Sequence, residues 1–277
     1  MQTINKDLLR IYTKKDIIAQ LEQMGAPRGS VVLMHSSLRS VGAIEGGAQA
    51  LLDAMVEYFT AEGGLFCVPT HTWGFMNEEI TLDVTSSRNC LGAFSTVAAE
   101  DGRGIRSDNA THSMVVFGDR ERALRFIADE WQVGSGTAPE SCYGKIYSEG
   151  GSILLVGVGH NRNTYLHSVS ELLGMQNRLA AEPSLVRVRL ADGAVVERRI
   201  RPHSTDYTRD ISLRFPKYET AFRYHGCIAD GYIGNAPTQL CDAVGMKKVI
   251  ELILERNGGE DPLRDEAAIP QSLYCYR

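Results

Sequence analysis

Two side chains near the middle of the chain, His167 and Glu171, have the types and the spacing of an acid–base pair. An imidazole accepts a proton near neutral pH, and a carboxylate one helical turn away can fix its tautomer and stabilise the cation that forms. The pair follows an apolar run, residues 152–159, that ends in Gly-x-Gly. Such a pair suits a reaction in which a nucleophile must lose a proton.

The flanking residues predict where this pair lies. Residues 152–156 are apolar and mostly β-prone, and a polar turn then precedes an amphipathic segment, so the pattern predicts a buried strand, a loop and a helix. Asn163 or Thr164 is placed to cap this helix, which puts His167 in its first turn. The positive end of the helix dipole disfavours imidazolium and keeps the histidine neutral. In α/β proteins, ligands usually bind at this end of a strand.

The rest of the chain alternates between helical and strand-like periodicity. Helices are predicted at residues 14–24, 46–59, 94–99, 119–131, 218–225 and 240–256, and strands at 30–34, 65–69, 111–118 and 226–233. Residues 134–147 are rich in turn formers and predict a loop. Residues 185–190 and 195–200 alternate around Ala-Asp-Gly, which predicts a hairpin. This pattern predicts a three-layer α/β/α sandwich with a mixed, largely parallel central sheet and an added antiparallel hairpin. No linker divides it, so we expect one domain over residues 1–277.

Composition excludes several classes of protein. The chain has 277 residues, of which 43% are hydrophobic and 23% charged, as in ordinary soluble globular proteins. A net charge of −5 argues against a nucleic-acid partner, and no apolar run reaches the length of a membrane span. The first seven residues carry charge where an export signal is apolar, so we expect a cytoplasmic protein. The six cysteines form no CxxC pair, so neither a structural zinc site nor a disulfide framework is expected.

Six short motifs, taken together, resemble the aminoglycoside 3-N-acetyltransferase family of acetyl-CoA-dependent enzymes. They are HSSL at 35–38 with Gly42 after it, EGG at 62–64 before VPT at 68–70, His112 with Ser113, APESCYGK at 138–145, LVGVGHNRNT at 155–164 with His167, and GYIGNA at 231–236. Their order and spacing span nearly the whole chain. The resemblance implies an α/β/α fold distinct from that of the common GNAT acetyltransferases. It also implies direct acetyl transfer from CoA to an amine.

One position departs from the family pattern. Family members typically have a glutamate three positions after the histidine, whereas this chain has Ser170 there and Glu171 one position later. Four positions still make about one helical turn, so His167 and Glu171 can share a face. The departure indicates a divergent branch whose acceptor need not be an aminoglycoside.

The resemblance assigns catalytic roles to three residues. His167 is predicted to be the general base that takes a proton from the attacking amine. Glu171 is either its orienting partner or an exposed helix carboxylate. Asp206 matches an acidic position beside an aromatic residue, where it would hold a cationic substrate, support the histidine, or serve only as a turn residue.

The resemblance also predicts contacts with acetyl-CoA, which is the expected cosubstrate. The loop after the first buried strand would contact it through backbone N–H groups and hydroxyls. Two further residues would lie on the diphosphate side, and the helix cap would double as a ligand contact. The loop residues are His35, Ser36, Ser37 and Leu38. The residues on the diphosphate side are Arg106 and Ser113, and the helix cap is Thr164.

We therefore expect a cytoplasmic antibiotic-resistance acyltransferase that acetylates a small-molecule amine, namely the 3-amino group of an aminoglycoside. The alternatives are a same-fold acetyltransferase for a non-aminoglycoside biosynthetic amine, a non-catalytic CoA-binding relative, and a hydrolase with a cysteine nucleophile at 67, 142 or 227. Histidines fall near several strand ends, but none has compact ligand spacing, so no metal is expected. The protein is expected to be a monomer or homodimer with no nucleic-acid or membrane partner.

Overall fold

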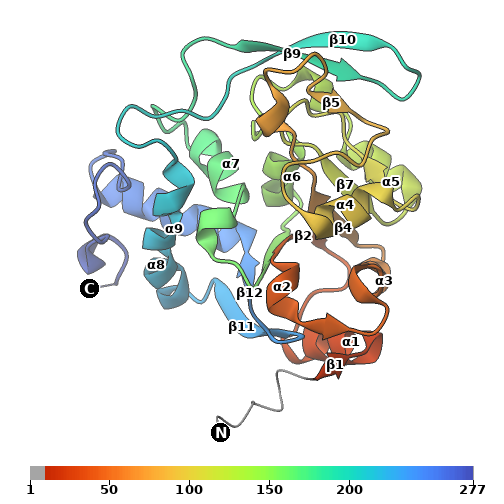
Figure 1. Ribbon diagram of the computed structural model, residues 1–277. Coiled ribbons are helices and arrows are strands. Elements are labelled where there is room, and N and C mark those ends of the chain that lie inside the picture. The colour runs from red at the N-terminus through yellow and green to blue at the C-terminus, as the bar shows by residue number, and fades with distance from the viewer. Residues whose placement is uncertain (1–9, 277) are drawn as a thin grey trace, which may run out of the picture.

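The centre of the molecule is a seven-stranded mixed sheet, seen in a computed structural model that describes residues 10–276 (Figure 1). The N-terminal residues that predict the absence of an export signal lie outside this range. The strand order across the sheet is β11 (Ile228–Ile233), β12 (Ala236–Asp242), β8 (Ser152–Val156), β2 (Val31–Ser36), β4 (Leu65–Pro69), β7 (Met114–Phe117) and β6 (Ile105–Arg106).

Only the three central strands are parallel. β2 lies between β8 and β4 and pairs with both in parallel. The two strands at each margin pair antiparallel to their inner neighbours. The first five residues of β2 are buried, as expected for a strand covered on both faces. The predicted mixed sheet is confirmed. Its parallel part is limited to the three central strands, which is less than the prediction of a largely parallel sheet.

A layer of helices covers each face of this sheet. One layer consists of α1 (Lys14–Gln23), α3 (Gly47–Thr60) and α4 (Ala93–Glu100). The other consists of α5 (Arg120–Phe126), α6 (Cys142–Ser148), α7 (Tyr165–Leu172), the 3-10 helix η5 (Ile211–Tyr218), α8 (Glu219–Tyr224) and α9 (Ala243–Arg256). Along β2, Val32 and Met34 pack on the first layer, and Val31 and Leu33 on the second. The predicted three-layer α/β/α sandwich is therefore confirmed.

The predicted hairpin is also present. β9 (Ser184–Arg189) and β10 (Val195–Ile200) pair antiparallel, and β5 (Leu82–Asp83) joins them to make a small second sheet. This sheet lies at the top of the molecule in Figure 1. It has its own small apolar core, which includes Val186, Val188 and Ile200.

The remaining elements are short. They are β1 (Ile11–Tyr12), β3 (Ala43–Ile44), α2 (Leu38–Val41), and the 3-10 helices η2 (Trp73–Phe75), η3 (Glu130–Gln132), η4 (His160–Arg162) and η6 (Gln271–Leu273). Across residues 10–276, no helix combines the length and the apolarity needed to cross a membrane.

Three elements differ from the sequence expectations. The loop predicted at 134–147 gives way to α6, because Ser141 caps this helix and Gly144 packs against the carbonyl of Pro139, where a Cβ would lie 2.0 Å from its oxygen. The helix predicted at 240–256 begins at Ala243, since residues 236–242 form β12 instead. The helix predicted at 119–131 ends at Phe126, and residues 130–132 form a separate 3-10 turn.

We expect Leu33→Ala to lower the free energy of unfolding by about 2–5 kcal/mol, because Leu33 is fully buried in the central strand and its loss leaves a cavity. Leu185→Ala is the matched control, since Leu185 is a strand leucine that is 55% exposed. Its cost should stay within about 0.5 kcal/mol. Urea unfolding of both variants measures the difference, and equal costs would contradict the assigned core.

Candidate active site

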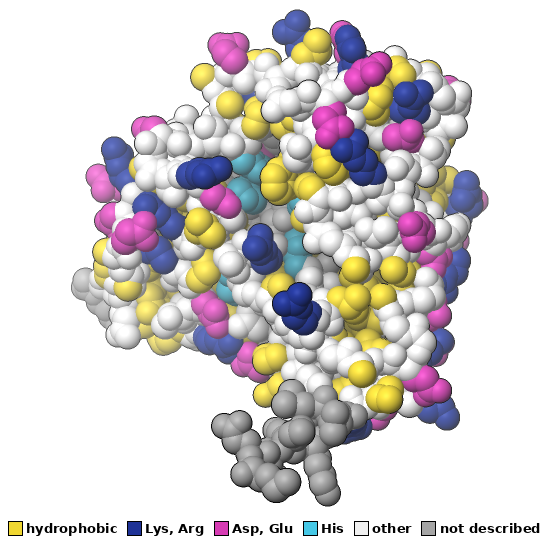
Figure 2. Space-filling model, in the orientation of Figure 1, with side chains coloured by type: hydrophobic (Ala, Val, Ile, Leu, Met, Phe, Trp, Pro, Cys, Tyr) yellow, Lys and Arg dark blue, Asp and Glu magenta, His cyan; other side chains and the backbone are white. Residues whose placement is uncertain are grey.

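Three strand ends meet at one edge of the sheet, because β2, β4 and β8 are parallel. His35 is near the end of β2, His71 follows β4, and Gly157 follows β8. Figure 2 shows histidine side chains on the floor of a hollow on one face of the molecule, with basic side chains near its margin. This edge is where the sequence predicts a ligand site.

Four histidines lie in a row at this edge, and we call them the histidine row: His71, His112, His203 and His167. Neighbouring ring centroids are 4.6 Å, 5.0 Å and 3.9 Å apart in that order. The inner end of the row is fixed by a 2.5 Å hydrogen bond between Nε2 of His71 and the hydroxyl of Tyr143. The outer end, His167, is half-buried.

His167 is the third residue of α7, in its first turn as predicted. Thr164 is the N-cap residue, but its side chain makes no capping hydrogen bond. The ring of Phe215 packs edge-on against His167 at 4.9 Å. Burial is the largest cause that lowers the pKa of His167 well below its ordinary value, and His203, Arg178 and His71 lower it further. The imidazole is therefore neutral near pH 7 and able to accept a proton.

Glu171, on the same helix, is held by two hydroxyl groups. Ser135 donates to its Oε2 and Thr137 donates to its Oε1, each at 2.6 Å. Burial acts to raise the pKa of Glu171, but the nearby imidazole of His203 and the hydrogen bonds from Ser135 and Thr137 outweigh it and the pKa is lowered. Its Oε1 lies 3.8 Å from Nε2 of His203. Glu171 therefore contacts His203, and its hydrogen bonds go to residues other than His167.

His203 is the site residue that sequence reasoning missed. It follows β10, and backbone hydrogen bonds hold the chain on both sides of it. On one side Arg201 N donates to Gly134 O at 2.9 Å, and on the other Ser204 N donates to Arg178 O at 3.0 Å. It lies in an irregular segment, where no periodicity indicates which way a side chain points.

Asp206, three residues further on, lies at the surface. Its carboxylate accepts a hydrogen bond from the side chain of Asn177, and its backbone N donates to Asn177 Oδ1 at 3.2 Å. These contacts fix Asp206 near the buried Arg178, which is paired with Asp261 at 2.6 Å. Asp206 thus stands apart from the hydrogen-bonded group around Glu171.

The predicted CoA loop lies beside a groove of about 630 Å³. His35 is almost fully buried, whereas Ser36, Ser37 and Leu38 are partly exposed. The groove is lined by Ser40 and by the turn 157–159, and also by residues of β11 and β12. Gly157 has φ +64°, and a Cβ there would lie 2.4 Å from the Cβ of Ser40, so the two segments approach this closely only because residue 157 is glycine.

Arg106 and Ser113, predicted on the diphosphate side, bond instead to the protein itself. The guanidinium of Arg106 donates to Ser113 Oγ at 3.2 Å, to Thr70 O at 2.8 Å and to Arg88 O at 3.1 Å. Ser113 is buried and its hydroxyl donates to Thr70 O at 2.8 Å. Burial lowers the pKa of Arg106 to about 10. The pair ties β6 to the segment after β4.

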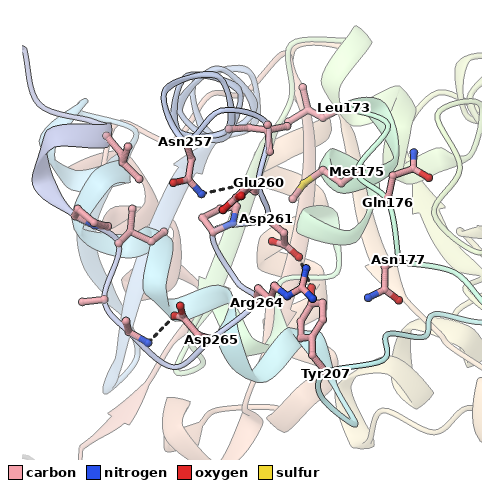
Figure 3. Close-up of a pocket in the computed structure, with 18 of the residues that line it drawn as sticks. Leu173, Met175, Gln176, Asn177, Tyr207, Asn257, Glu260, Asp261, Arg264 and Asp265 are labelled. Atoms are coloured by element: carbon pink, nitrogen blue, oxygen red, sulfur yellow. Dashed lines mark hydrogen bonds between the residues drawn. The ribbon is translucent and has the colours of Figure 1, made fainter.

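A larger cavity lies elsewhere. It has a volume of about 860 Å³ and is lined mainly by residues 173–177, which follow α7, and by residues between 254 and 273 (Figure 3). Tyr207 donates a hydrogen bond to Asp261 in its wall. His167, Glu171 and His203 do not line it, so this cavity is separate from the histidine row.

Burial disfavours the cysteine alternative. Burial raises the pKa of Cys67 and of Cys142, and it raises the pKa of Cys227 to about 11, so the nucleophilic thiolate is disfavoured at all three positions. Among residues 10–276, no group of three or more His, Cys, Asp or Glu side chains is arranged to hold a metal ion.

Gly136→Ala should destabilise the protein by about 1–3 kcal/mol through overpacking. A Cβ at residue 136 would lie 2.0 Å from Nδ1 of His112, in the middle of the histidine row. Gly134→Ala, two residues earlier, is the control because nothing lies within 4 Å of its Cβ position. Chemical unfolding of the two variants tests the packing of the row, and a neutral Gly136→Ala would contradict it.

Stability should also fall as the pH drops below about 6.5. Burial lowers the pKa of His35 to about 3. The unfolded chain binds a proton at His35 below its ordinary pKa while the folded chain does not, which costs about 1.4 kcal/mol per pH unit. His35→Gln should therefore show a shallower pH slope of the unfolding free energy between about pH 6.5 and 5. Parallel slopes for the variant and the wild type would refute the burial of a neutral His35.

Comparison with known proteins identifies relatives of this chain. The family described as aminoglycoside 3-N-acetyltransferase matches residues 33–255. Aminoglycoside N(3)-acetyltransferase IV of Salmonella sp is 28% identical over 162 residues, which are 58% of this chain and 59% of that protein. The SPbeta prophage-derived aminoglycoside N(3')-acetyltransferase-like protein YokD of Bacillus subtilis (strain 168) is 25% identical over 175 residues, 56% of this chain and 63% of that protein. The chain thus spans less than two thirds of the length of these two relatives.

Solved structures share the fold. AAC-IIIb in a binary complex with CoASH superposes with a TM-score of 0.77 at 20% identity, covering 91% of this chain and 100% of that one. A variant of the aminoglycoside acetyltransferase AAC(3)-IVa in complex with a gentamicin superposes with a TM-score of 0.75 at 23% identity, covering 99% and 96%. Because the family match extends over most of its length, this chain belongs to the aminoglycoside 3-N-acetyltransferase family.

Proposed function

We propose that this protein transfers the acetyl group of acetyl-CoA to an amine, and that the acceptor is the 3-amino group of an aminoglycoside. The observation that carries the proposal is that the family match includes α7, whose first turn holds a neutral histidine beside the ends of the parallel strands. The CoASH complex of AAC-IIIb supports the donor, and the gentamicin complex of AAC(3)-IVa supports the acceptor.

His167 is the general base of this reaction. The lone pair of the amine nitrogen forms a bond to the acetyl carbonyl carbon, and the bond from that carbon to sulfur breaks. His167 accepts the proton that the amine nitrogen loses and passes it to the departing sulfur, which leaves as the CoA thiol and returns His167 to its neutral form. A base with a lowered pKa suits this step, because the amine N–H becomes acidic only as its nitrogen attacks.

Two carboxylates serve the same step in this proposal. Glu171 provides negative charge near the base once His167 is protonated, since its hydrogen bonds keep it ionised. Asp206, exposed near the same segment, attracts a polycationic acceptor. The net charge of −5 has the same sign as Asp206 and favours the approach of a cation.

The groove beside residues 36–40 fits the narrow arm of CoA. Gly157 and Ser40 both line it, and they approach so closely that a Cβ at residue 157 would overlap the side chain of Ser40. Ser40 lines it two residues after Leu38, and Ser36, Ser37 and Leu38 are partly exposed. The partly exposed Thr164 precedes α7. Acetyl-CoA supplies the activated acetyl group, and these residues bind and orient it. The proposal for CoA binding rests on this loop and omits Arg106 and Ser113, whose hydrogen bonds are already made within the protein.

His167→Ala should lower the rate of CoA thiol release by at least about a hundredfold, because it removes the general base. The assay measures thiol release from acetyl-CoA with a panel of aminoglycosides and simpler amines. His225→Ala is the matched control, since His225 caps the end of α8, bonds to Tyr274 O at 2.7 Å and lies outside the histidine row.

Other results would redirect the assignment. Thiol release with simple amines but with no aminoglycoside would indicate a biosynthetic acceptor. Binding of acetyl-CoA with no release for any amine would indicate a non-catalytic relative. Full activity of His167→Ala would remove His167 from the role of base while leaving the transferase activity intact.

A further inference from the structure

We propose that His203 is a positioning residue for His167: it fixes the plane of the base by stacking on it and connects it to Glu171. This inference rests on the proposed function and adds a residue to its acid–base step.

The geometry of the two rings restricts the base. The imidazoles of His167 and His203 are 3.9 Å apart between centroids, and their planes differ by 5°. Phe215 meets His167 edge-on at 71°. A ring held flat on one side and contacted edge-on by another aromatic ring has a restricted rotamer, and restriction of this kind keeps a base in reach of its substrate.

Hydrogen bonding determines the tautomer of His203. Thr137 has one hydroxyl hydrogen, which it donates to Oε1 of Glu171 at 2.6 Å, because a carboxylate only accepts. The 2.8 Å contact between Thr137 Oγ1 and Nε2 of His203 must then be donated by His203. His203 therefore carries its proton on Nε2, and Glu171 fixes its orientation through Thr137.

The main chain also holds His203 in place. Leu179 and His203 form an antiparallel bridge, and Ser135 and Arg201 form a parallel one. Ala180 N also donates to the carbonyl oxygen of residue 202 at 2.9 Å. Two separate loops therefore hold the segment that carries His203, which makes it a rigid support.

The charged and titratable groups around the pair set the direction of the pH effect. Glu171 faces His203 from α7, and His112 faces it from the segment before β7. Burial first, and then His203, Arg178 and His71, lower the pKa of His167. Replacing His203 with a neutral ring removes one of these causes, so the pKa of His167 rises and more of it is protonated at a given pH.

The test is the variant His203→Phe, which keeps a flat ring and removes both ring nitrogens. We expect kcat for thiol release to fall about tenfold to a hundredfold, with KM for acetyl-CoA unchanged. The acidic limb of the pH profile of kcat/KM should move to higher pH, because the base must be neutral to act. His225→Phe is the matched control and should behave as wild type.

A conservative pair tests the link through Thr137. Thr137→Ser keeps the hydroxyl and should retain most of the wild-type rate, whereas Thr137→Val removes it and should lower kcat as His203→Phe does. If His203→Phe does not fold, this pair of variants still tests whether His203 positions His167.

The outcomes separate the two proposals. Wild-type kcat and pH profile in His203→Phe, with His167→Ala inactive, would overturn the role of His203 and leave the proposed function standing. A lower kcat with an unmoved acidic limb would indicate that His203 has only a structural role. That result would also overturn the proposed positioning role.

If the wild type released no thiol with any amine, the proposed function would fail instead. Nitrogen-15 spectra of the imidazoles would then still test the pair, since we expect the His203 proton on Nε2 and a titration of His167 that moves to higher pH in His203→Phe. A proton on Nδ1 of His203 would refute the arrangement.

Discussion

The carboxylate of Glu171 is mostly out of water, and a buried charge must find hydrogen-bond donors. The hydroxyls of Ser135 and Thr137 supply them, and the ring of His203 completes the group. These residues come from α7, from the loop before α6, and from the segment after β10. The need to satisfy one carboxylate therefore draws three distant parts of the chain to the same edge of the sheet.

Close packing then limits what the loop before α6 can contain. Gly136 sits against Nδ1 of His112, where a Cβ has no room, and its carbonyl accepts from Asn109 Nδ2 at 3.1 Å. The neighbouring Ser135 and Thr137 can thus point to Glu171 while residue 136 stays clear of the histidine row. This geometry requires small and hydroxyl-bearing residues in the loop. Because such residues are also common in turns, the sequence of the loop does not distinguish it from an ordinary turn.

The parts of this molecule that can be predicted from the sequence are those that periodicity encodes. The strand, loop and helix around His167, the α/β/α layers and the hairpin at residues 184–200 follow from it and are present. Periodicity does not reveal α6 or β12, because buried packing overrides their Pro and Gly content. His203 cannot be found from the sequence, since its place depends on bridges to Leu179 and, through Arg201, to Ser135.

The position of the glutamate, one residue later than in the family pattern, explains why His203 lies between Glu171 and His167. Successive residues on a helix are rotated by about 100°, so a carboxylate at residue 171 leaves the axis in a different direction from one at residue 170. Ser170 turns its hydroxyl back to Leu166 O at 3.1 Å, while Glu171 reaches Ser135 and Thr137. A carboxylate moved in this way no longer needs to contact His167 directly if a second imidazole lies between them. The parallel ring of His203, bonded to Thr137 and flat against His167, occupies that place.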